Sequence, residues 1–119
     1  MKKKILVLEN DADISLIISH ILCEEGYEPI LCNDYQEVFE NISTHKPDVI
    51  LLDVIRPTEA GTELCRTLKA AESTKHIPVI VLSTHARIEE VKNGCADEIV
   101  KKPFDIDTLV GAVKQQLAA

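Results

Sequence analysis

Polar side chains that could bind a metal ion or handle a phosphoryl group follow four of the short apolar segments in this sequence. Glu9 and Asn10 follow the first segment, Asp53 and Ser83 follow two central ones, and Lys102 lies just past the last. Carboxylates suit a hard cation such as Mg²⁺, which keeps waters and phosphate oxygens as further ligands. A lysine ammonium and a hydroxyl group can bind phosphoryl oxygens. Together these residue types favour a phosphoryl site with a cation, if the fold brings them to one place.

Each of these residues alone also has an ordinary structural explanation. A single aspartate such as Asp53 at a strand end is more often a turn former or a helix cap than a nucleophile. Lys102, which precedes a proline, would usually be a solvated charge, and Ser83 a turn residue. The acidic run that begins at Glu9 could simply favour the start of a helix. The site hypothesis therefore depends on the coincidence of these residues at one edge of a fold.

Two kinds of segment alternate along the chain and would position these residues. The apolar segments lack inside–outside alternation, as is typical of strands that are covered on both faces in a parallel sheet. They are Ile5–Leu8, Ile30–Cys32, Val49–Leu52, Val79–Leu82 and Ile99–Val100. Segments with a helical period lie between and after them, over Ile14–Leu22, Tyr35–Ser43, Glu59–Ala71, Arg87–Asn93 and Ile106–Leu117.

Helix signals support this division. Asp11 or Asp13 could cap the first helix, and Gly26 stands just past its end. The periodicity places several apolar side chains on the inner face of the helices, among them Ile17, Phe39 and Ile106.

Five strands that alternate with five helices predict one doubly wound α/β domain of (βα)₅ type over residues 1–119. Right-handed crossovers would bring the carboxyl ends of all five parallel strands to one edge of the sheet. Open parallel sheets bind ligands in the crevice at that edge. The five polar residues would therefore lie close together.

Composition narrows the class of protein further. The net charge is −7 with a pI near 5.0, so we expect no direct nucleic-acid binding. The four cysteines have no metal-like spacing with histidine, which favours reduced thiols and a cytoplasmic protein. We see no signal peptide and no apolar stretch long enough for a membrane span. The four glycines are isolated, so the sequence has neither a GxGxxG motif nor a P-loop.

Four segments of the chain resemble the receiver domains of two-component response regulators. They are ILVLEND (Ile5–Asp11), PDVILLDVIRPTEAGTEL (Pro47–Leu64), HIPVIVLSTHA (His76–Ala86) and ADEIVKKPF (Ala96–Phe104). The resemblance implies a flavodoxin-like sheet with five parallel strands in the order 2-1-3-4-5. It also implies phosphorelay signalling: the domain accepts a phosphoryl group from a sensor histidine kinase or a phosphotransfer protein. It would then act on a downstream effector domain or protein by changing conformation, without being a turnover enzyme.

The resemblance assigns a role to each candidate residue. Asp53 looks like the phosphoacceptor, which would form an aspartyl phosphate. Glu9 and Asn10 match the acidic pair that holds Mg²⁺ together with Asp53, and the backbone carbonyl of Ile55 would supply a further ligand. Lys102 would pair with the phosphoryl oxygens, and Ser83 would move toward the phosphoryl group and bond it.

The chain departs from the family pattern at three places. Asn10 stands where the pattern has Asp or Glu, so we expect a weakened affinity for Mg²⁺. Ile99 stands at the position of a switch aromatic. The segment between Ser83 and Lys102 is shorter than usual, in a region that often serves output and dimerisation, so a homodimer is possible.

Two other functions remain open from the sequence. Asn10 and Ile99 would suit a pseudo-receiver, an interaction module with this fold but weak or no phosphorylation. A hydrolase with an aspartyl nucleophile is the third hypothesis, and a second Asp at position 55 would favour it, but that residue is Ile55.

Overall fold

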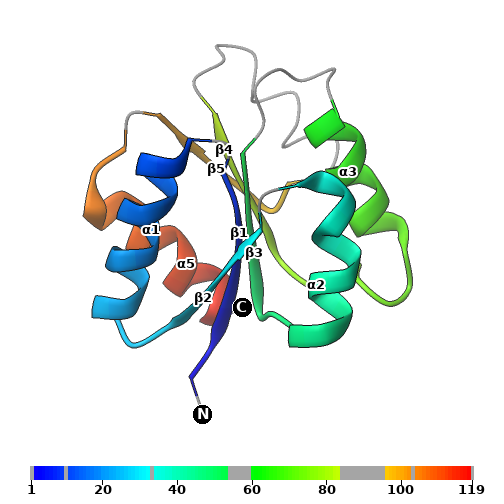
Figure 1. Ribbon diagram of the computed structural model, residues 1–119, viewed down its shortest axis with the longest axis horizontal. Helices are drawn as coiled ribbons and strands as arrows, with labels where there is room; N and C mark the ends of the chain where they lie inside the picture. The colour runs from blue at the N-terminus through cyan, green and yellow to red at the C-terminus, as the bar shows by residue number, and fades with distance from the viewer. Residues whose placement is uncertain are drawn as a thin grey trace.

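The computed structural model describes residues 2–9, 11–32, 34–53, 60–83, 96–102 and 104–118. In these residues one parallel sheet lies between two layers of helices (Figure 1). The strands are β1 (Lys4–Leu8), β2 (Glu28–Cys32), β3 (Val49–Asp53), β4 (Val79–Ser83) and β5 (Glu98–Lys101). The helices are α1 (Ala12–Glu24), α2 (Val38–His45) after a 3₁₀ turn at Tyr35–Glu37, α3 (Ala60–Ala70) and α5 (Ile106–Ala118). The helix expected at Arg87–Asn93 falls outside the described residues.

The sheet has the predicted topology. Its strand order is β2-β1-β3-β4-β5, and every neighbouring pair is parallel. The doubly wound α/β prediction is therefore confirmed. The chain enters β1 at the bottom of Figure 1, so the carboxyl ends of the strands lie at the top. The register places Asp53 of β3 opposite Leu82 of β4, one residue before Ser83.

Successive residues of the central strands pack into opposite layers. On β1, Leu6 and Leu8 belong to the apolar cluster beneath α2 and α3, whereas Ile5 and Val7 belong to the cluster beneath α1 and α5. All four side chains are buried. Full burial of an aliphatic side chain of this size contributes about 1.5–3 kcal/mol, so neither face tolerates a polar residue. This two-sided burial explains why these segments lack inside–outside alternation in the sequence.

Three side chains that we expected in the core are exposed. Ile17, Phe39 and Ile106 are 57%, 40% and 58% exposed, respectively. Two consecutive residues of a helix point about 100° apart, so only one of them faces the sheet fully. Ile18 is the buried neighbour of Ile17, and Val38 is the buried neighbour of Phe39. Ile106 is the first residue of α5 and precedes the part of this helix that packs into the core.

The ends of α1 are defined by Asp11 and Gly26. The Asp11 carboxylate accepts hydrogen bonds from the backbone N–H groups of Asp13 and Ile14, at 2.9 and 3.2 Å. Asp11 is therefore the N-cap, and Asp13 is not. Gly26 has a φ of 86°, a left-handed conformation that costs glycine little. The predicted stop of this helix is confirmed.

Of the four cysteines, Cys23, Cys32 and Cys65 are free thiols, and Cys95 falls outside the described residues. Across the helices that the structure describes, none has the length and apolar character needed to span a bilayer.

Candidate functional site

The candidate residues lie at the carboxyl edge of the sheet because each one ends or follows a strand. Glu9 is the residue after β1, Asp53 ends β3, Ser83 ends β4, and Lys102 is the residue after β5. Parallel pairing brings these strand ends together although the residues lie far apart in the chain.

The Lys102 ammonium joins two carboxylates at this edge. Its Nζ donates hydrogen bonds to Glu9 Oε1 at 3.0 Å and to Asp53 Oδ1 at 3.1 Å. The side chains of Glu9, Asp53 and Lys102 are only 1%, 8% and 13% exposed. The expected convergence of these three residues is therefore observed in the structure.

One oxygen of Glu9 is left without a hydrogen bond. Oε1 accepts bonds from Lys102 and from the backbone N–H of Asp11, the latter at 3.2 Å. Oε2 lies 2.9 Å from Lys102 Nζ, but this contact lacks hydrogen-bond geometry, and no described group donates to Oε2. Oε2 thus contacts a positive charge without a hydrogen bond of its own, and such a carboxylate oxygen is also a suitable ligand for a hard cation.

Burial and charge set the protonation behaviour of the site. Burial raises the pKa of Glu9, the hydrogen bonds from Lys102 and Asp11 partly oppose this, and the negative charge of Asp53 adds to the rise. Burial alone would lower the pKa of Lys102, but the bonds and charges of Glu9 and Asp53 outweigh it, and the pKa is raised. Lys102 therefore stays charged, and two carboxylates share one ammonium.

Ser83 lies at the same edge, and its backbone pairs with that of Lys102 across the two strands. It is buried at the end of β4, and its carbonyl oxygen accepts a hydrogen bond from the N–H of Lys102 at 2.9 Å. This bond extends the pairing of β4 with β5 by one residue. It also fixes the backbone of Lys102, from which the side chain extends. Ser83 thus stands on the strand beside Asp53.

The other two predicted ligands lie outside the described residues. Asn10 and Ile55 belong to the parts of the chain that the structure does not describe. The side chain of Asp11 caps α1, so this carboxylate serves the helix. Among residues 2–9, 11–32, 34–53, 60–83, 96–102 and 104–118, no three His, Cys, Asp or Glu side chains cluster as metal ligands.

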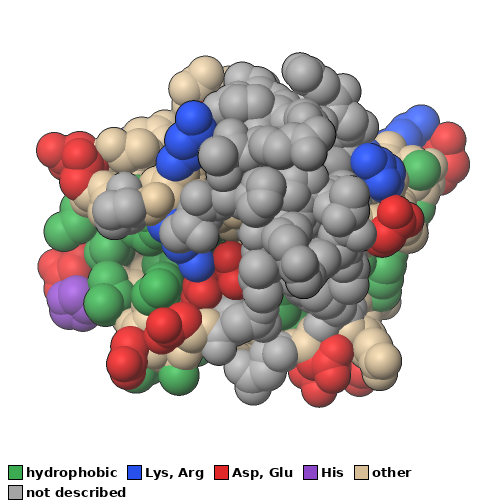
Figure 2. Space-filling model, turned by 90° about the horizontal axis from the view of Figure 1, so that it is seen from above, with side chains coloured by type: hydrophobic (Ala, Val, Ile, Leu, Met, Phe, Trp, Pro, Cys, Tyr) green, Lys and Arg blue, Asp and Glu red, His purple; other side chains and the backbone are tan. Residues whose placement is uncertain are grey.

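Sequence reasoning missed the backbone N–H of Asp11 as a group that positions Glu9. The sequence signal for this role is weak. A capping aspartate indicates where a helix starts, but it does not indicate which group its own backbone N–H contacts. Seen from above in Figure 2, basic and acidic side chains adjoin near the middle of the carboxyl edge, beside the area drawn in grey.

The chain is similar to proteins of one family over nearly its whole length. The family model described as the response regulator receiver domain matches residues 5–114. The phosphate regulon transcriptional regulatory protein PhoB of Escherichia coli (strain K12) is 32% identical over 117 residues, which cover 96% of this chain and 51% of that protein. The chain thus spans about half the length of the curated relatives that it matches.

Two solved structures share the fold closely. The signal receiver domain of a signal transduction histidine kinase from Syntrophus aciditrophicus has a TM-score of 0.86 and 32% identity, covering 98% of this chain and 90% of that one. The receiver domain of sensor histidine kinase PA1611 from Pseudomonas aeruginosa PAO1 has a TM-score of 0.88 over 100% of both chains and holds a magnesium ion in its active site cleft. At 21% identity, the second likeness concerns the fold alone.

Proposed function

This chain belongs to the response regulator receiver domain family of two-component signalling, and from that membership we propose that it accepts a phosphoryl group on Asp53. The single observation that carries the proposal is the Lys102 ammonium, which contacts both Asp53 and Glu9 in a nearly buried site. Such an arrangement places a fixed positive charge beside the oxygen that would attack phosphorus.

The proposed reaction is a direct transfer. A carboxylate oxygen of Asp53 attacks the phosphorus of a phosphohistidine whose other ring nitrogen is protonated. The phosphorus–nitrogen bond breaks with its electron pair on nitrogen, and a neutral imidazole leaves. The product is an aspartyl phosphate, whose added negative charge Lys102 partly neutralises. Ser83, on the neighbouring strand, would donate its hydroxyl hydrogen to a phosphoryl oxygen.

Glu9, Asp53, Asn10 and the carbonyl of Ile55 would hold a Mg²⁺ ion. The oxygen-rich donor set fits this ion, and so does Glu9 Oε2, which has no donor among the described residues. When bound, Mg²⁺ supplies positive charge against the developing charge of the transferred group. Asn10 supplies a neutral oxygen where a carboxylate would supply charge, so we expect a weakened affinity.

The proposed partners follow from the same chemistry. A sensor histidine kinase or a phosphotransfer protein would donate the phosphoryl group, and an effector domain or protein would respond to the altered shape. The relatives are about twice as long as this chain, and PhoB is a transcriptional regulatory protein. The absence of direct nucleic-acid binding therefore remains a prediction for residues 1–119, as do their organisation as a single domain and the possible homodimer.

The pseudo-receiver remains the second candidate because of Ile99. This side chain is half-buried on β5 and packs against the cluster beneath α2 and α3. An aliphatic residue in this position lacks the ring that would couple to Ser83. A pseudo-receiver would keep the fold and the ion pairs without forming the adduct.

Acetyl phosphate separates these candidates without a cognate kinase. The native protein should gain the mass of one phosphoryl group in Mg²⁺ and none in EDTA. Asp53→Asn should gain none, whereas Asp48→Asn, altered at the opposite edge of the sheet, should gain it as the native protein does. No adduct at high Mg²⁺ would favour the pseudo-receiver, and sustained turnover of a phosphorylated metabolite would favour a hydrolase.

A further inference from the structure

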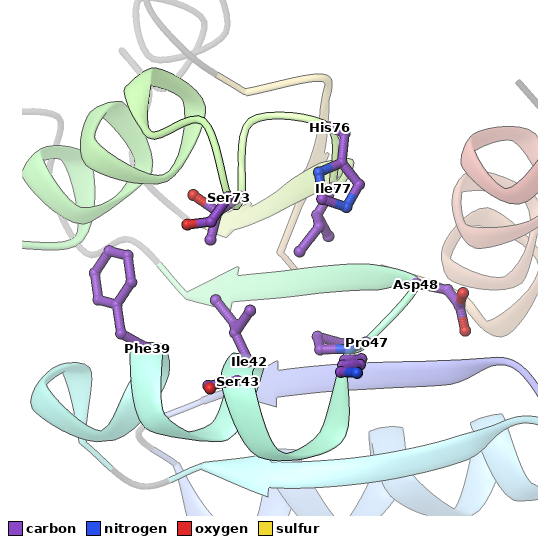
Figure 3. A pocket seen from close by; sticks show the side chains of 10 residues that line it. Phe39, Ile42, Ser43, Pro47, Asp48, Ser73, His76 and Ile77 are labelled. Carbon is purple, nitrogen blue, oxygen red and sulfur yellow. The ribbon is translucent and has the colours of Figure 1, made fainter.

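A cavity lies along α2, from Phe39 near the start of this helix to Pro47 and Asp48 at the amino end of β3. It has a volume of about 530 Å³, within the range of small-molecule sites. It lies between α2 and the segment that joins α3 to β4 (Figure 3). Its lining residues are Phe39, Ile42, Ser43, Lys46, Pro47, Asp48, Ser73, Thr74, His76 and Ile77. None of them belongs to the candidate phosphoryl site.

Hydrogen bonds hold both walls of the cavity in place. In the α3–β4 segment, the Thr74 hydroxyl donates to Leu68 O at 2.7 Å, and Lys69 Nζ donates to Ile77 O at 3.1 Å. On the other wall, the N–H of Lys46 donates to Ile42 O at 2.8 Å. These bonds fix the backbone of both walls of the cavity.

The middle of the cavity is apolar. In Figure 3, Phe39 and Ile42 rise from α2 toward the α3–β4 segment, and Ile77 points back toward Ile42. Ile42 and Ile77 are nearly buried, whereas Phe39, one of two phenylalanines in the chain, stays largely exposed beside the hollow. An exposed aromatic ring next to an apolar hollow is a surface that a ligand could cover.

Lys46 supplies an exposed cation at the rim of the cavity. Lys46 and His76 line the cavity, and both residues are exposed. Asp48 is turned away from it in Figure 3, and its carboxylate accepts a hydrogen bond from the N–H of Lys4 at 2.8 Å. With one lysine and one aspartate the lining is formally neutral, in contrast with the net charge of −7 of the whole chain.

Lys46 also has an unusual backbone. Its φ of 51° makes it the non-glycine residue with a left-handed conformation in the described part of the chain. That conformation costs most residues roughly 1–2 kcal/mol, and glycine or asparagine is the usual choice after a helix. A lysine at this place also puts a positive charge at the carboxyl end of α2, where a cation is favourable.

We propose that this cavity binds a small organic acid. Its apolar body lies between Ile42, Ile77 and the Phe39 ring, and its carboxylate lies at the rim against Lys46, with His76 as a second donor. The site is separate from Asp53, so it is independent of the phosphoryl-transfer proposal.

Phenylbutyrate is a suitable probe, and phenylbutanol is its neutral counterpart. Titrated into the ¹⁵N-labelled native protein, phenylbutyrate should shift amide signals of α2 and residues 71–78. Phenylbutanol should bind about two- to fivefold more weakly, the loss expected for an ion pair with an exposed ammonium group. Equal affinity for the two compounds would show that the cationic rim does not select an acid. Shifts spread over the whole surface, or no shifts, would overturn the site itself.

A variant tests Lys46 directly. Lys46→Asn removes the charge and keeps a residue that tolerates the left-handed backbone, so the fold should persist. It should weaken the binding of phenylbutyrate about two- to fivefold and leave the binding of phenylbutanol unchanged. Lys75→Gln, which removes an exposed lysine paired with Glu72 outside the lining, should bind both compounds like the native protein. Equal weakening by both variants would contradict the assignment to Lys46.

Discussion

Two nearly buried carboxylates share one ammonium group at the carboxyl edge of the sheet. Lys102 is bonded to Glu9 and to Asp53, so a substitution of any of the three changes the charge balance of the other two. The residue that we expect to hold the phosphoryl group is thus coupled to a residue that we expect to hold the metal ion. Their protonation is open to measurement without a kinase.

The titration of Glu9 is a first prediction. Its pKa is raised above the ordinary value of 4.5, so protonated Glu9 contributes stability that is fully present below pH 4.5 and is lost as the pH rises through the folded-state pKa. Without Mg²⁺, the free energy of unfolding of the native protein should therefore fall relative to that of Glu9→Gln across this window. Urea unfolding at a series of pH values measures both.

The same titration has a metal-dependent control. Added Mg²⁺ favours the ionised carboxylate, so it should lower the pKa of Glu9 as followed by ¹³C NMR. A midpoint at or below 4.5 without metal would contradict the burial argument, and so would a constant difference between the two unfolding curves.

The charge of residue 10 gives a second prediction. Asn10→Asp adds one negative charge to the proposed metal site. Two opposite unit charges 4 Å apart attract each other by about 1 kcal/mol even in bulk water, so the added charge should strengthen metal binding. Mg²⁺ should bind at least about fivefold more tightly, as measured by isothermal titration calorimetry. Asp11→Asn is the matched control, because it alters a carboxylate that caps α1 and should leave the affinity near its native value. Equal affinities of Asn10→Asp and the native protein would refute this explanation.

Among the elements, α1 begins at a single capping side chain. Asp11 satisfies two N–H groups of the first turn, so Asp11→Ala should lower the free energy of unfolding by about 1 kcal/mol. Asp11→Asn should cost little, because asparagine caps as well as aspartate. Asp13→Ala, which removes a charge from the same turn without removing the cap, should cost only a few tenths of a kcal/mol. Chemical denaturation compares the three, and equal losses for both alanine variants would contradict the assignment of the cap.

The sequence predicts the elements well where one signal decides them. Apolar segments such as Val49–Leu52 are predicted correctly as buried strands because both faces of the sheet are covered, and the structure adds only the polar end residue Asp53. Adjacent apolar residues such as Ile17 and Ile18 are harder, because periodicity does not say which of the two faces the sheet. The choice between Asp11 and Asp13 as the N-cap likewise depends on backbone geometry, which the sequence alone does not give.

At the scale of the whole molecule, the fold keeps the candidate phosphoryl site and the cavity along α2 apart, with no residue in common. The convergence of Glu9, Asp53 and Lys102 was predictable, because parallel topology alone brings strand ends together. The cavity near Ile42 was not, because its volume depends on how α2 packs against a segment remote in sequence. The bonds made by individual atoms, such as Asp11 N–H to Glu9, also depend on tertiary geometry.

The whole molecule is a signalling device only if Asp53 itself carries the phosphoryl group. The most direct measurement is to incubate the native protein with Mg²⁺ and acetyl phosphate, reduce the acyl phosphate with borohydride, and sequence the peptides by mass spectrometry. Homoserine at position 53, and at no other aspartate, is the predicted result. Homoserine elsewhere, or an unmodified Asp53 at saturating Mg²⁺, would contradict the proposal.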